Sequence, residues 1–475
     1  MYYRICDDTA LRKWKFVPRA YYKLDLTEAE GLGEKQFETM LLCDGEHELE
    51  ESPVLKGLID LGLVEPCEKG EAPSEWSRLK EYPHRYFPKI NLMITGKCNY
   101  NCIHCFNAAD NTPLMSEWKY EDALDLIQQA ADCGIRSFTL TGGEPMLYKH
   151  FMDIVREIYR LKMSVFEINT NGYFINQKVL DELKEIGCDA KMKISFDGLG
   201  HHDWMRNRKG AEEKTLAAMK LCIDNGFTVM SQTNVNRVNL ESMEKTLDML
   251  DEMGVECTRI IRTTEAARWQ QAAGDACLSF PEYYEAMTRL VASYSKKEHR
   301  MRLIIWQFME FDPACRSYKM IPVHFTEGEY RPTYPVCADN RKMIAVSSDG
   351  ILYPCLQMSG SFYEVGIELD NLHKRRLKDI LAGGDLHDKI CANLHKLAKE
   401  NPVCGQCRYY KYCAGGCRAI GIICSVEKFE KGCEINYYGE DKAKCLFFNY
   451  GWYKKISAAL KGFTNLSYVE FLENN

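Results

Sequence analysis

The strongest constraint on the fold is a run of alternating strand and helix patterns that begins at residue 89. Six short stretches read as strands: KINLMIT, SFTLTG, SVFEINT, AKMKISF, TVMSQTNV and CTRIIRT. Amphipathic helical stretches such as FMDIVREIYRLK and KVLDELKEIG lie between them. Strands that alternate with helices form a parallel sheet with right-handed crossovers. The sequence therefore predicts an α/β fold with a partial (β/α)6 barrel, whose chemistry lies at the C-terminal ends of the strands.

The regions on either side of this pattern predict two further domains. Residues 1–88 combine an extended YYKLDL with helical periodicity in EKQFETMLLCDG, and they end in the polar, Pro-bearing EKGEAPSEWSRLKEYPHRYFP. We expect a compact α+β domain over 1–88, the barrel over 89–300, and a cysteine-rich domain over 301–475. Three domains agree with roughly 150 residues per domain in a chain of 475 residues.

Composition excludes several classes of protein. A formal net charge of −7 disfavours a protein that mainly follows a nucleic-acid backbone. No apolar stretch approaches the length of a membrane-spanning helix, and the first residues lack the apolar core of a signal peptide. We therefore expect a cytoplasmic protein with neither nucleic acid nor membrane as a partner. In a reducing cytoplasm, the 22 cysteines favour metal ligation or redox chemistry over disulfides.

Three of these cysteines lie on one predicted loop, GKCNYNCIHCFN, directly after the first barrel strand. Cys98, Cys102 and Cys105 can hold three irons of a [4Fe-4S] cube and leave the fourth iron without a protein ligand. An open position of this kind distinguishes a catalytic metal site from a structural one. The alternative is a zinc site completed by a distant residue such as His104.

The spacing Cys98-x3-Cys102-x2-Cys105, with His104 before the third cysteine, resembles the signature of the radical S-adenosylmethionine (SAM) superfamily, whose core is a TIM-like partial barrel. Each further segment taken alone is also compatible with a tight turn or a helix cap. Their order along the chain matches the family. The matching residues are Gly142, Gly143, Glu144 and Pro145 in TGGEP, Asn169, Thr170 and Asn171 in NTNG, Ser195 and Asp197 in SFDG, and Arg206 in HHDWMRNRKG.

The resemblance implies a SAM-binding role for each segment. TGGEP would receive the SAM amino group, with glycines that let the backbone approach a ligand closely. Ser195 would lie near the ribose and methionine parts of SAM. Asp197 would either contact SAM as well or face the substrate. Arg206 would pair with the SAM carboxylate, which suits a guanidinium fork. The implied chemistry is one-electron reduction of the cluster, cleavage of SAM to a 5′-deoxyadenosyl radical, and hydrogen abstraction from a substrate.

The C-terminal cysteines resemble the seven-cysteine SPASM pattern of radical SAM enzymes with auxiliary clusters. Within it, SSDGILYPC predicts a hairpin that turns at Asp349-Gly350. The resemblance implies two auxiliary [4Fe-4S] clusters and about twelve irons in all. The implied ligands are Cys337, Cys355 and Cys417 for the first auxiliary cluster, and Cys404, Cys407 and Cys413 with Cys445, or alternatively Cys433, for the second.

The fourth ligand of the first auxiliary cluster is open. Some relatives supply it six residues before the position of Cys337, where this chain has Arg331. Cys315 is the nearest upstream candidate; without it, one iron is open to a substrate thiolate or carboxylate, and a bound thiolate would be ready for bond formation. A pair of zinc knuckles that bind nucleic acid is the alternative, which the chain charge disfavours.

Residues 1–88 resemble the winged-helix element that captures the leader of ribosomally made precursor peptides as an added strand; the alternative is a structural domain without a ligand. The whole chain thus resembles the peptide maturases, which implies a precursor peptide and a reducing partner such as flavodoxin or ferredoxin. Our first hypothesis is formation of a thioether between a cysteine sulfur and a carbon. The alternatives are a carbon–carbon crosslink, formylglycine formation as in anaerobic sulfatase maturation, and a multi-cluster electron carrier, which would need no SAM site.

Overall fold

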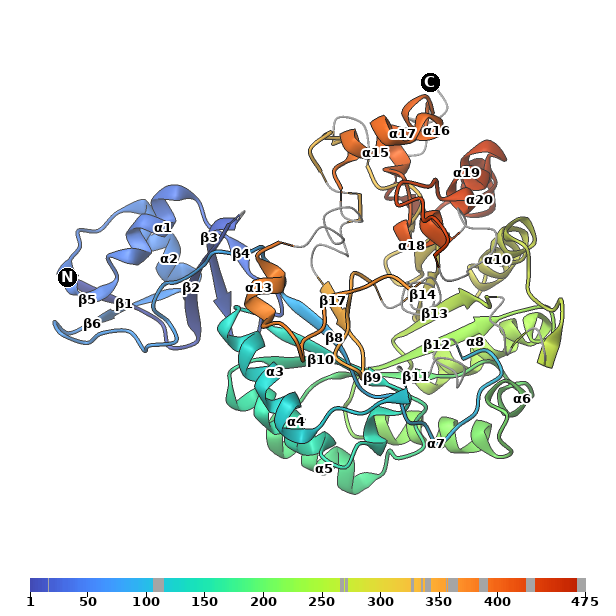
Figure 1. Ribbon diagram of the computed structural model, residues 1–475, viewed down its shortest axis with the longest axis horizontal. Coiled ribbons are helices and arrows are strands. Elements are labelled where there is room, and N and C mark those ends of the chain that lie inside the picture. Colours follow the sequence, from blue (N-terminus) through green and yellow to red (C-terminus); the bar gives the residue numbers. More distant parts are fainter. Residues whose placement is uncertain are drawn as a thin grey trace.

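The computed structural model describes residues 1–15, 17–105, 115–264, 269, 272–325, 329–334, 336–337, 343–355, 357, 366–383, 392–423 and 432–467. A small N-terminal body projects from one side of a large α/β body, and the C-terminal helices lie above the open side of the large sheet (Figure 1). The α/β class and the parallel sheet predicted from the sequence are confirmed.

The N-terminal region contains a three-stranded sheet, β5-β1-β6, and a four-stranded sheet, β4-β3-β2-β7. Its core includes Phe37 and Met40 of one helix and Leu55 and Leu58 of the other. The winged-helix prediction stays a prediction. The elements are β1 (Tyr2–Ile5), β2 (Thr9–Trp14), β3 (Val17–Lys23), β4 (Glu30–Gly31), α1 (Glu34–Leu41), β5 (Asp44–Glu48), α2 (Pro53–Asp60), β6 (Val64–Cys67) and β7 (Lys80–Tyr82).

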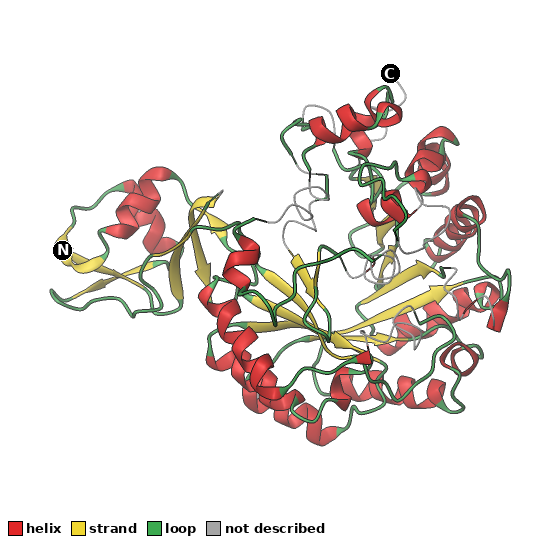
Figure 2. Cartoon of the chain, in the orientation of Figure 1, coloured by secondary structure: helices red, strands yellow, loops and turns green. Residues whose placement is uncertain are grey.

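The six strands expected from the sequence all form and lie side by side in parallel. Helices cover the outer face of the sheet (Figure 2). The strands are β8 (Lys89–Thr95), β9 (Ser137–Gly142), β10 (Ser164–Thr170), β11 (Lys191–Ser195), β12 (Val229–Val235) and β13 (Cys257–Arg262). The helical segments between and after them are α3 (Tyr120–Asp132), η2 (Pro145–Leu147), α4 (Phe151–Arg160), α5 (Gln177–Ile186), α6 (His202–Arg206), α7 (Ala211–Asp224), η3 (Leu240–Ser242), α8 (Met243–Met253) and α10 (Phe280–Tyr294).

The sheet continues beyond the six expected strands on both edges. A parallel strand adds to β13 and another to β8, so segments beyond residue 300 complete the barrel wall. Each is only four residues long, too short for a clear periodicity. The added strands are β14 (Arg302–Ile305), β15 (Met309–Asp312), β16 (Ser317–Met320), β17 (Met343–Val346), β18 (Leu352–Tyr353) and β19 (Thr464–Asn465).

Alternation along the strands separates an apolar outer face from a polar inner face. Met192 and Ile194 of β11 belong to the core under the helices. Lys191, Lys193 and Ser195 therefore point to the interior of the barrel, because successive side chains of a strand face opposite sides.

The C-terminal region is built from short helices around small apolar clusters. Among the described residues, no helix is both long and apolar enough to cross a membrane. The helices are α13 (Leu377–Leu381), α15 (Leu394–Glu400), α16 (Pro402–Gly405), α17 (Tyr410–Cys413), α18 (Arg418–Ile423), α19 (Lys442–Asn449) and α20 (Trp452–Ala459).

Candidate functional site

The loop with Cys98, Cys102 and Cys105 leaves the C-terminal end of β8, where a barrel presents its chemistry. Its backbone is folded back on its own cysteines: the Tyr100 N–H donates to Cys98 Sγ at 3.4 Å, and the Cys105 N–H donates to the Cys102 carbonyl at 3.3 Å. The loop is thus fixed by local hydrogen bonds before any metal contributes.

The two glycines of TGGEP allow the end of β9 to cross the start of the cysteine loop. A Cβ on Gly142 would lie 2.3 Å from the Thr95 carbonyl oxygen, and one on Gly143 would lie 2.3 Å from that of Lys97. The Gly143 N–H donates to Thr95 O at 2.7 Å. We expected these glycines to make room for a ligand; the close approach in the structure is to the chain's own backbone. Their effect is to fix TGGEP against the cysteine loop.

Glu144 ties the ends of two strands together. Its carboxylate accepts hydrogen bonds from Thr170 Oγ1 at 2.7 Å and from the Asn171 N–H at 2.8 Å, and a third from the Met146 N–H at 3.3 Å. The side chain is fully buried, and burial raises the pKa of Glu144 to about 7, against these three hydrogen bonds. The carboxyl can therefore change its charge near neutral pH, and an ammonium beside it would favour the ionised form.

Asn171 connects the NTNG segment to the cysteine loop, because its Nδ2 donates to Asn99 Oδ1 at 2.8 Å and lies 3.9 Å from Cys98 Sγ. Nearby, the Oδ1 of Asn169 and the Nδ1 of His104 are buried without a hydrogen-bond partner in the part of the chain that the structure describes. Burial also lowers the pKa of His104 to about 4, so its imidazole is neutral. Unsatisfied buried polar atoms are costly, and a polar ligand such as SAM fits this environment.

Asp197 and Arg206 form a buried ion pair behind the cysteine loop, with 2.8 Å between Asp197 Oδ2 and Arg206 Nε. Asp197 Oδ1 also accepts from the Asn234 N–H at 3.0 Å. Burial is the largest single effect and opposes the charge on Asp197, but Arg206 together with His104 and His202 outweighs it and holds the pKa of this carboxyl well below its usual range. The guanidinium also lies 3.7 Å from Cys102 Sγ. The structure thus places Arg206 against Asp197, and its pairing with SAM stays a prediction.

His202 also belongs to this network, although no sequence motif marks it. Its Nδ1 accepts from the Asp197 N–H at 3.0 Å, and its Nε2 lies 3.2 Å from Thr215 Oγ1. Thr215 in turn donates to the Asn171 carbonyl at 3.2 Å. These contacts connect the ends of β10 and β11 through α6 and α7. The doubled histidine in HHDWMR was the only available signal, and it does not reveal which histidine turns inward.

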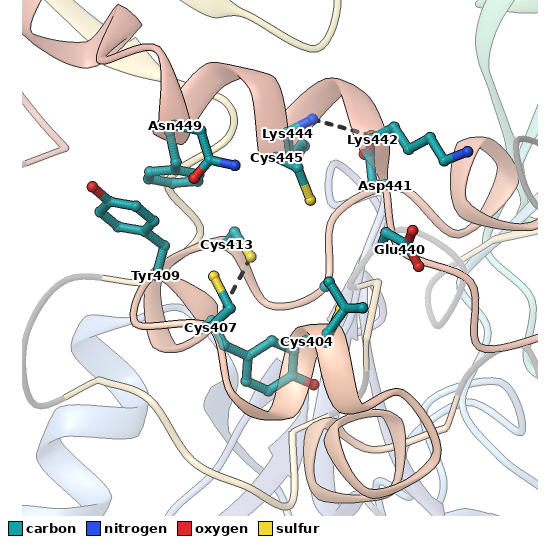
Figure 3. Close-up of a pocket in the computed structure, with 14 residues that line it drawn as sticks. Cys404, Cys407, Tyr409, Cys413, Glu440, Asp441, Lys442, Lys444, Cys445 and Asn449 are labelled. Atoms are coloured by element: carbon teal, nitrogen blue, oxygen red, sulfur yellow. Dashed lines mark hydrogen bonds between the residues drawn. The ribbon is translucent and has the colours of Figure 1, made fainter.

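The second cysteine group surrounds a cavity of about 220 Å³ (Figure 3). Its lining includes Cys404, Cys407, Cys413 and Cys445, and it does not include Cys433. Burial raises the pKa of Cys413 and of Cys445 to about 12, so these thiols keep their protons until a metal displaces them. The four thiols that the resemblance implied for the second auxiliary cluster are therefore brought to one cavity.

The donor spacing of this cavity suits a cluster better than a lone ion. Among the residues that the structure describes, no three His, Cys, Asp or Glu side chains converge closely enough to hold a single metal ion. A four-iron cube binds each cysteine on a different iron and so tolerates wider separation than one tetrahedral zinc. Four cysteines around one cavity are compatible with such a cube.

Asp441 joins the two groups of C-terminal cysteines. One carboxylate oxygen accepts from the Cys417 N–H at 2.8 Å, and the other caps α19 by accepting from the Lys444 N–H at 3.2 Å. The residue is 2% exposed. A Cβ on Gly416 would lie 2.5 Å from Asp441 Cβ, so the glycine allows this close packing. Asp441 therefore sets the position of Cys417 relative to the helix that carries Cys445.

Two cysteines of the first auxiliary set pack together. Cys355 and Cys417 contact the same small apolar cluster, and Cys337 and Cys355 both lie close enough to raise the pKa of the buried Cys417 thiol, although burial has the larger effect. The predicted hairpin before Cys355 is confirmed, with Gly350 at φ +81°.

The two remaining candidates lie elsewhere. The structure places Cys315 on the exposed turn between β15 and β16, where Asp312 is its nearest charged neighbour. Cys433 is half-buried and outside the lining of the four-cysteine cavity. Arg331 stands at its expected place before Cys337, and its Nη1 donates to the Tyr330 carbonyl at 3.0 Å.

Comparison with known families identifies both cysteine regions. Residues 92–250 match the radical SAM superfamily, and residues 337–408 match SPASM, an iron-sulfur cluster-binding domain. The two matched segments contain all three cysteines of the barrel loop and four of the candidate cluster ligands in the C-terminal region, Cys337, Cys355, Cys404 and Cys407.

Individual relatives are distant but cover much of the chain. An AdoMet-dependent heme synthase of Methanosarcina barkeri is 24% identical over 71% of this chain and 93% of its own. A PqqA peptide cyclase of Granulibacter bethesdensis is 24% identical over 64% of this chain and 76% of its own. The crystal structure of Streptococcus suis SuiB bound to precursor peptide SuiA has a TM-score of 0.61 at 15% identity, covering 90% of this chain and 98% of SuiB.

Proposed function

Because the chain is a radical SAM enzyme with a SPASM domain, we propose that it modifies a ribosomally made precursor peptide by forming a thioether between a cysteine sulfur and a carbon atom. The observation that supports a peptide substrate best is the extent of the fold likeness to SuiB. The unmatched tenth of 475 residues is about 48 residues, fewer than the 88 of the N-terminal region. At least part of that region therefore has a counterpart in a protein that binds a precursor peptide.

We assign one task to each region of the chain. Residues 1–88 bind the leader of the precursor, residues 89–300 hold SAM and its cluster, and residues 301–475 hold two auxiliary clusters. The N-terminal region is firmly attached for this purpose: Arg136 at the start of β9 donates to the carbonyls of Leu24 at 2.6 Å and Leu26 at 3.1 Å. Leader binding would then fix the rest of the peptide relative to the barrel.

The cysteines are suited to hold three [4Fe-4S] clusters. Cys98, Cys102 and Cys105 leave one iron open for SAM, whereas the four-cysteine cavity satisfies its cluster completely. When bound, SAM and the clusters supply the radical that removes a hydrogen atom from the substrate and an acceptor for the electron that remains. Thioether formation removes a hydrogen atom from the carbon, a proton from the thiol and one electron. It therefore needs both the radical and the electron acceptor.

The protein's own contribution is positioning. Glu144, set by Thr170 and Asn171, is placed to orient an ammonium group, and the glycines of TGGEP hold it beside the cysteine loop. The ion pair of Asp197 and Arg206 places two opposite charges behind that loop, so that this region carries no net charge from the pair. A fixed site of this kind holds reactants in one geometry and excludes water.

The thioether is preferred to the alternatives because Arg331 stands where a fourth cysteine completes the first auxiliary cluster in some relatives. A substrate thiolate can take the position that this leaves. Formylglycine formation, as in anaerobic sulfatase maturation, does not require a leader-binding region. A carbon–carbon crosslink does not require an iron that can bind a thiolate.

The test uses a cysteine-bearing short reading frame encoded next to the gene. We expect the reconstituted enzyme to remove two hydrogen atoms from that peptide, as measured by mass spectrometry, and to make one cysteine resistant to iodoacetamide. The same mass loss with every cysteine still alkylated would indicate a carbon–carbon crosslink. An aldehyde that reacts with hydroxylamine would indicate formylglycine. Either result would refute the thioether.

The leader proposal has a separate test that leaves the enzyme unchanged. A leader-free core peptide should be processed at least tenfold more slowly than the full precursor, because it binds without the N-terminal region. Equal rates would refute leader recognition while leaving the chemistry in place.

A second candidate is a tetrapyrrole substrate. It is favoured by the match to a heme synthase over 93% of that protein's length. A shift of the Soret band when an iron porphyrin is added to the reconstituted enzyme would support this second candidate.

A further inference from the structure

A row of polar side chains crosses the inner face of the barrel at one level. Ser195 of β11 is the cross-strand neighbour of Gln232 in β12, which is in turn the neighbour of Arg259 in β13. Ile194 and Ile260, the next residues along β11 and β13, belong to the core under the helices. Because side chains alternate between faces, Ser195 and Arg259 both project into the barrel, at the same level as Gln232.

Arg259 brings a positive charge to this row. Glu310 of β15 lies at the same level, two strands away, and Glu167 of β10 is already paired: its Oε1 lies 2.9 Å from Lys193 Nζ, and both side chains are about 10% exposed. Burial lowers the pKa of Lys193, and the charge of Arg259 contributes to the same shift. No hydrogen bond or ion pair to Arg259 is formed within the described ranges of the chain.

Other cationic side chains near the inner face have contacts of their own. Lys89 pairs with Glu28 at 3.2 Å, and Lys191 lies 5.7 Å from the centre of the Phe166 ring. Arg206, to which the sequence assigned the SAM carboxylate, is paired with Asp197. A carboxylate that entered the barrel would therefore find Arg259 without a competing partner.

We propose that Arg259, with Gln232 beside it, binds a carboxylate in the barrel interior. The planar guanidinium matches a carboxylate with two parallel hydrogen bonds, and the Arg259 side chain is only partly buried, so that a ligand in the barrel can reach it. The carboxylate is that of the methionine part of SAM, near Ser195, or an acidic group of the substrate; only the second source rests on the proposed peptide function.

The first arm of the test is a binding cycle with reconstituted holoenzyme under anaerobic conditions. The probes are SAM and decarboxylated SAM, which differ only in the carboxylate, measured by equilibrium dialysis. Wild type should prefer SAM by at least about tenfold, and Arg259→Gln should lose that preference. The control is Arg302→Gln, an exposed arginine at the start of β14 that pairs with Glu256 at 2.7 Å. It removes the same charge and should keep the preference.

The second arm uses two blocked peptides, acetyl-Gly-Cys-Glu-Gly-amide and its Gln counterpart, which differ in one carboxylate. If the substrate supplies the carboxylate, wild type should bind the Glu peptide more tightly, and Arg259→Gln should bind both alike. Should Arg259→Gln fail to fold, Arg259→Lys, which keeps the charge but not the fork, is expected to show a weakened preference in the same arm.

The proposal is overturned if Arg259→Gln, or Arg259→Lys in its place, matches wild type with both pairs of probes. The SAM arm does not depend on the substrate. A failure of the peptide-maturase proposal therefore leaves that arm interpretable, and a failure of the carboxylate site leaves thioether formation untouched.

Discussion

The barrel loop and the four-cysteine cavity both gather thiols, but their surroundings differ. Around Cys98, Cys102 and Cys105 lie groups that a charged ligand can use: the carboxyl of Glu144 and unpartnered polar atoms of buried side chains. Around Cys404, Cys407, Cys413 and Cys445 the cavity is lined by aromatic rings such as Tyr410 and Phe448 and by charged residues of the segment that leads into α19. Three thiols leave one iron of a cube open for a ligand, whereas four thiols can ligate every iron.

The two sites also differ in how the chain assembles them. Three cysteines of the cavity come from one stretch of ten residues, Cys404 to Cys413, and Cys445 is added by α19. The barrel site needs the ends of β8, β9, β10 and β11, which are spread over about a hundred residues. Spacing therefore reveals the cavity almost completely, whereas the ligand environment of the barrel loop depends on the sheet.

The largest expected effect comes from removing the open cluster. Changing Cys98, Cys102 and Cys105 together to Ala should abolish 5′-deoxyadenosine formation and reduce iron from about twelve to about eight atoms per chain. Chromatographic analysis of anaerobic reactions and iron determination provide the measurements. Cys315→Ala is the control: as an exposed cysteine on a turn, it should keep full iron. A triple variant that still cleaves SAM would contradict the assignment.

Removing the closed cluster should separate the two sites. Changing Cys404 and Cys407 to Ala should cost about four irons and stop product formation, while slow SAM cleavage continues in the barrel. Deoxyadenosine and product are measured in the same reaction. The comparison between the sites breaks down if both quantities fall together in a protein whose circular dichroism is unchanged.

Substitution of Asp441 tests whether side-chain hydrogen bonds, in addition to the clusters, stabilise the C-terminal region. Asp441→Ala removes the cap of α19 and leaves the Cys417 N–H without its acceptor, at a cost of about 2–4 kcal/mol in unfolding free energy. Asp441→Asn keeps one acceptor oxygen and should lose less. Thermal unfolding and iron content measure the effect; equal stability of the two variants would show that the carboxylate is not the link.

The smallest effect concerns the pH dependence of the barrel site. The pKa of Glu144 is raised from 4.5 to about 7 by burial, so the folded protein holds a proton that the unfolded chain has already lost. The unfolding free energy should therefore fall as pH rises from about 4.5 to 7, and then level off. SAM affinity should fall about tenfold per pH unit below 7, because a protonated carboxyl no longer pairs with an ammonium.

Glu144→Gln is the matched variant for this effect, since the amide keeps one acceptor oxygen and has no charge to titrate. Its SAM affinity should be weaker and flat between pH 6 and 8 in equilibrium dialysis. A wild-type profile that is equally flat would show that Glu144 does not face the amino group.

Features that depend on residues close together in the sequence could be predicted from the sequence. The six strands followed from apolar periodicity, and the hairpin before Cys355 followed from Asp349-Gly350. Strands as short as β14 and β17 left no such pattern, although they complete the barrel wall. The sequence also cannot show that the Thr95–Lys97 backbone lies against the glycines of TGGEP, because that close approach depends on how β8 and β9 pack.

The sequence by itself determined the spacing of the cysteines: three lie in the loop from Cys98 to Cys105, and three lie between Cys404 and Cys413. Only the tertiary structure decided which charges are paired. The sequence does not distinguish Arg206 from Arg259, but packing buries the first against Asp197, whereas the second forms no ion pair in the part of the chain that the structure describes. The physical reason is that an ion pair depends on distances of a few ångströms between side chains, which are set when strands and helices pack, and not by the order of residues.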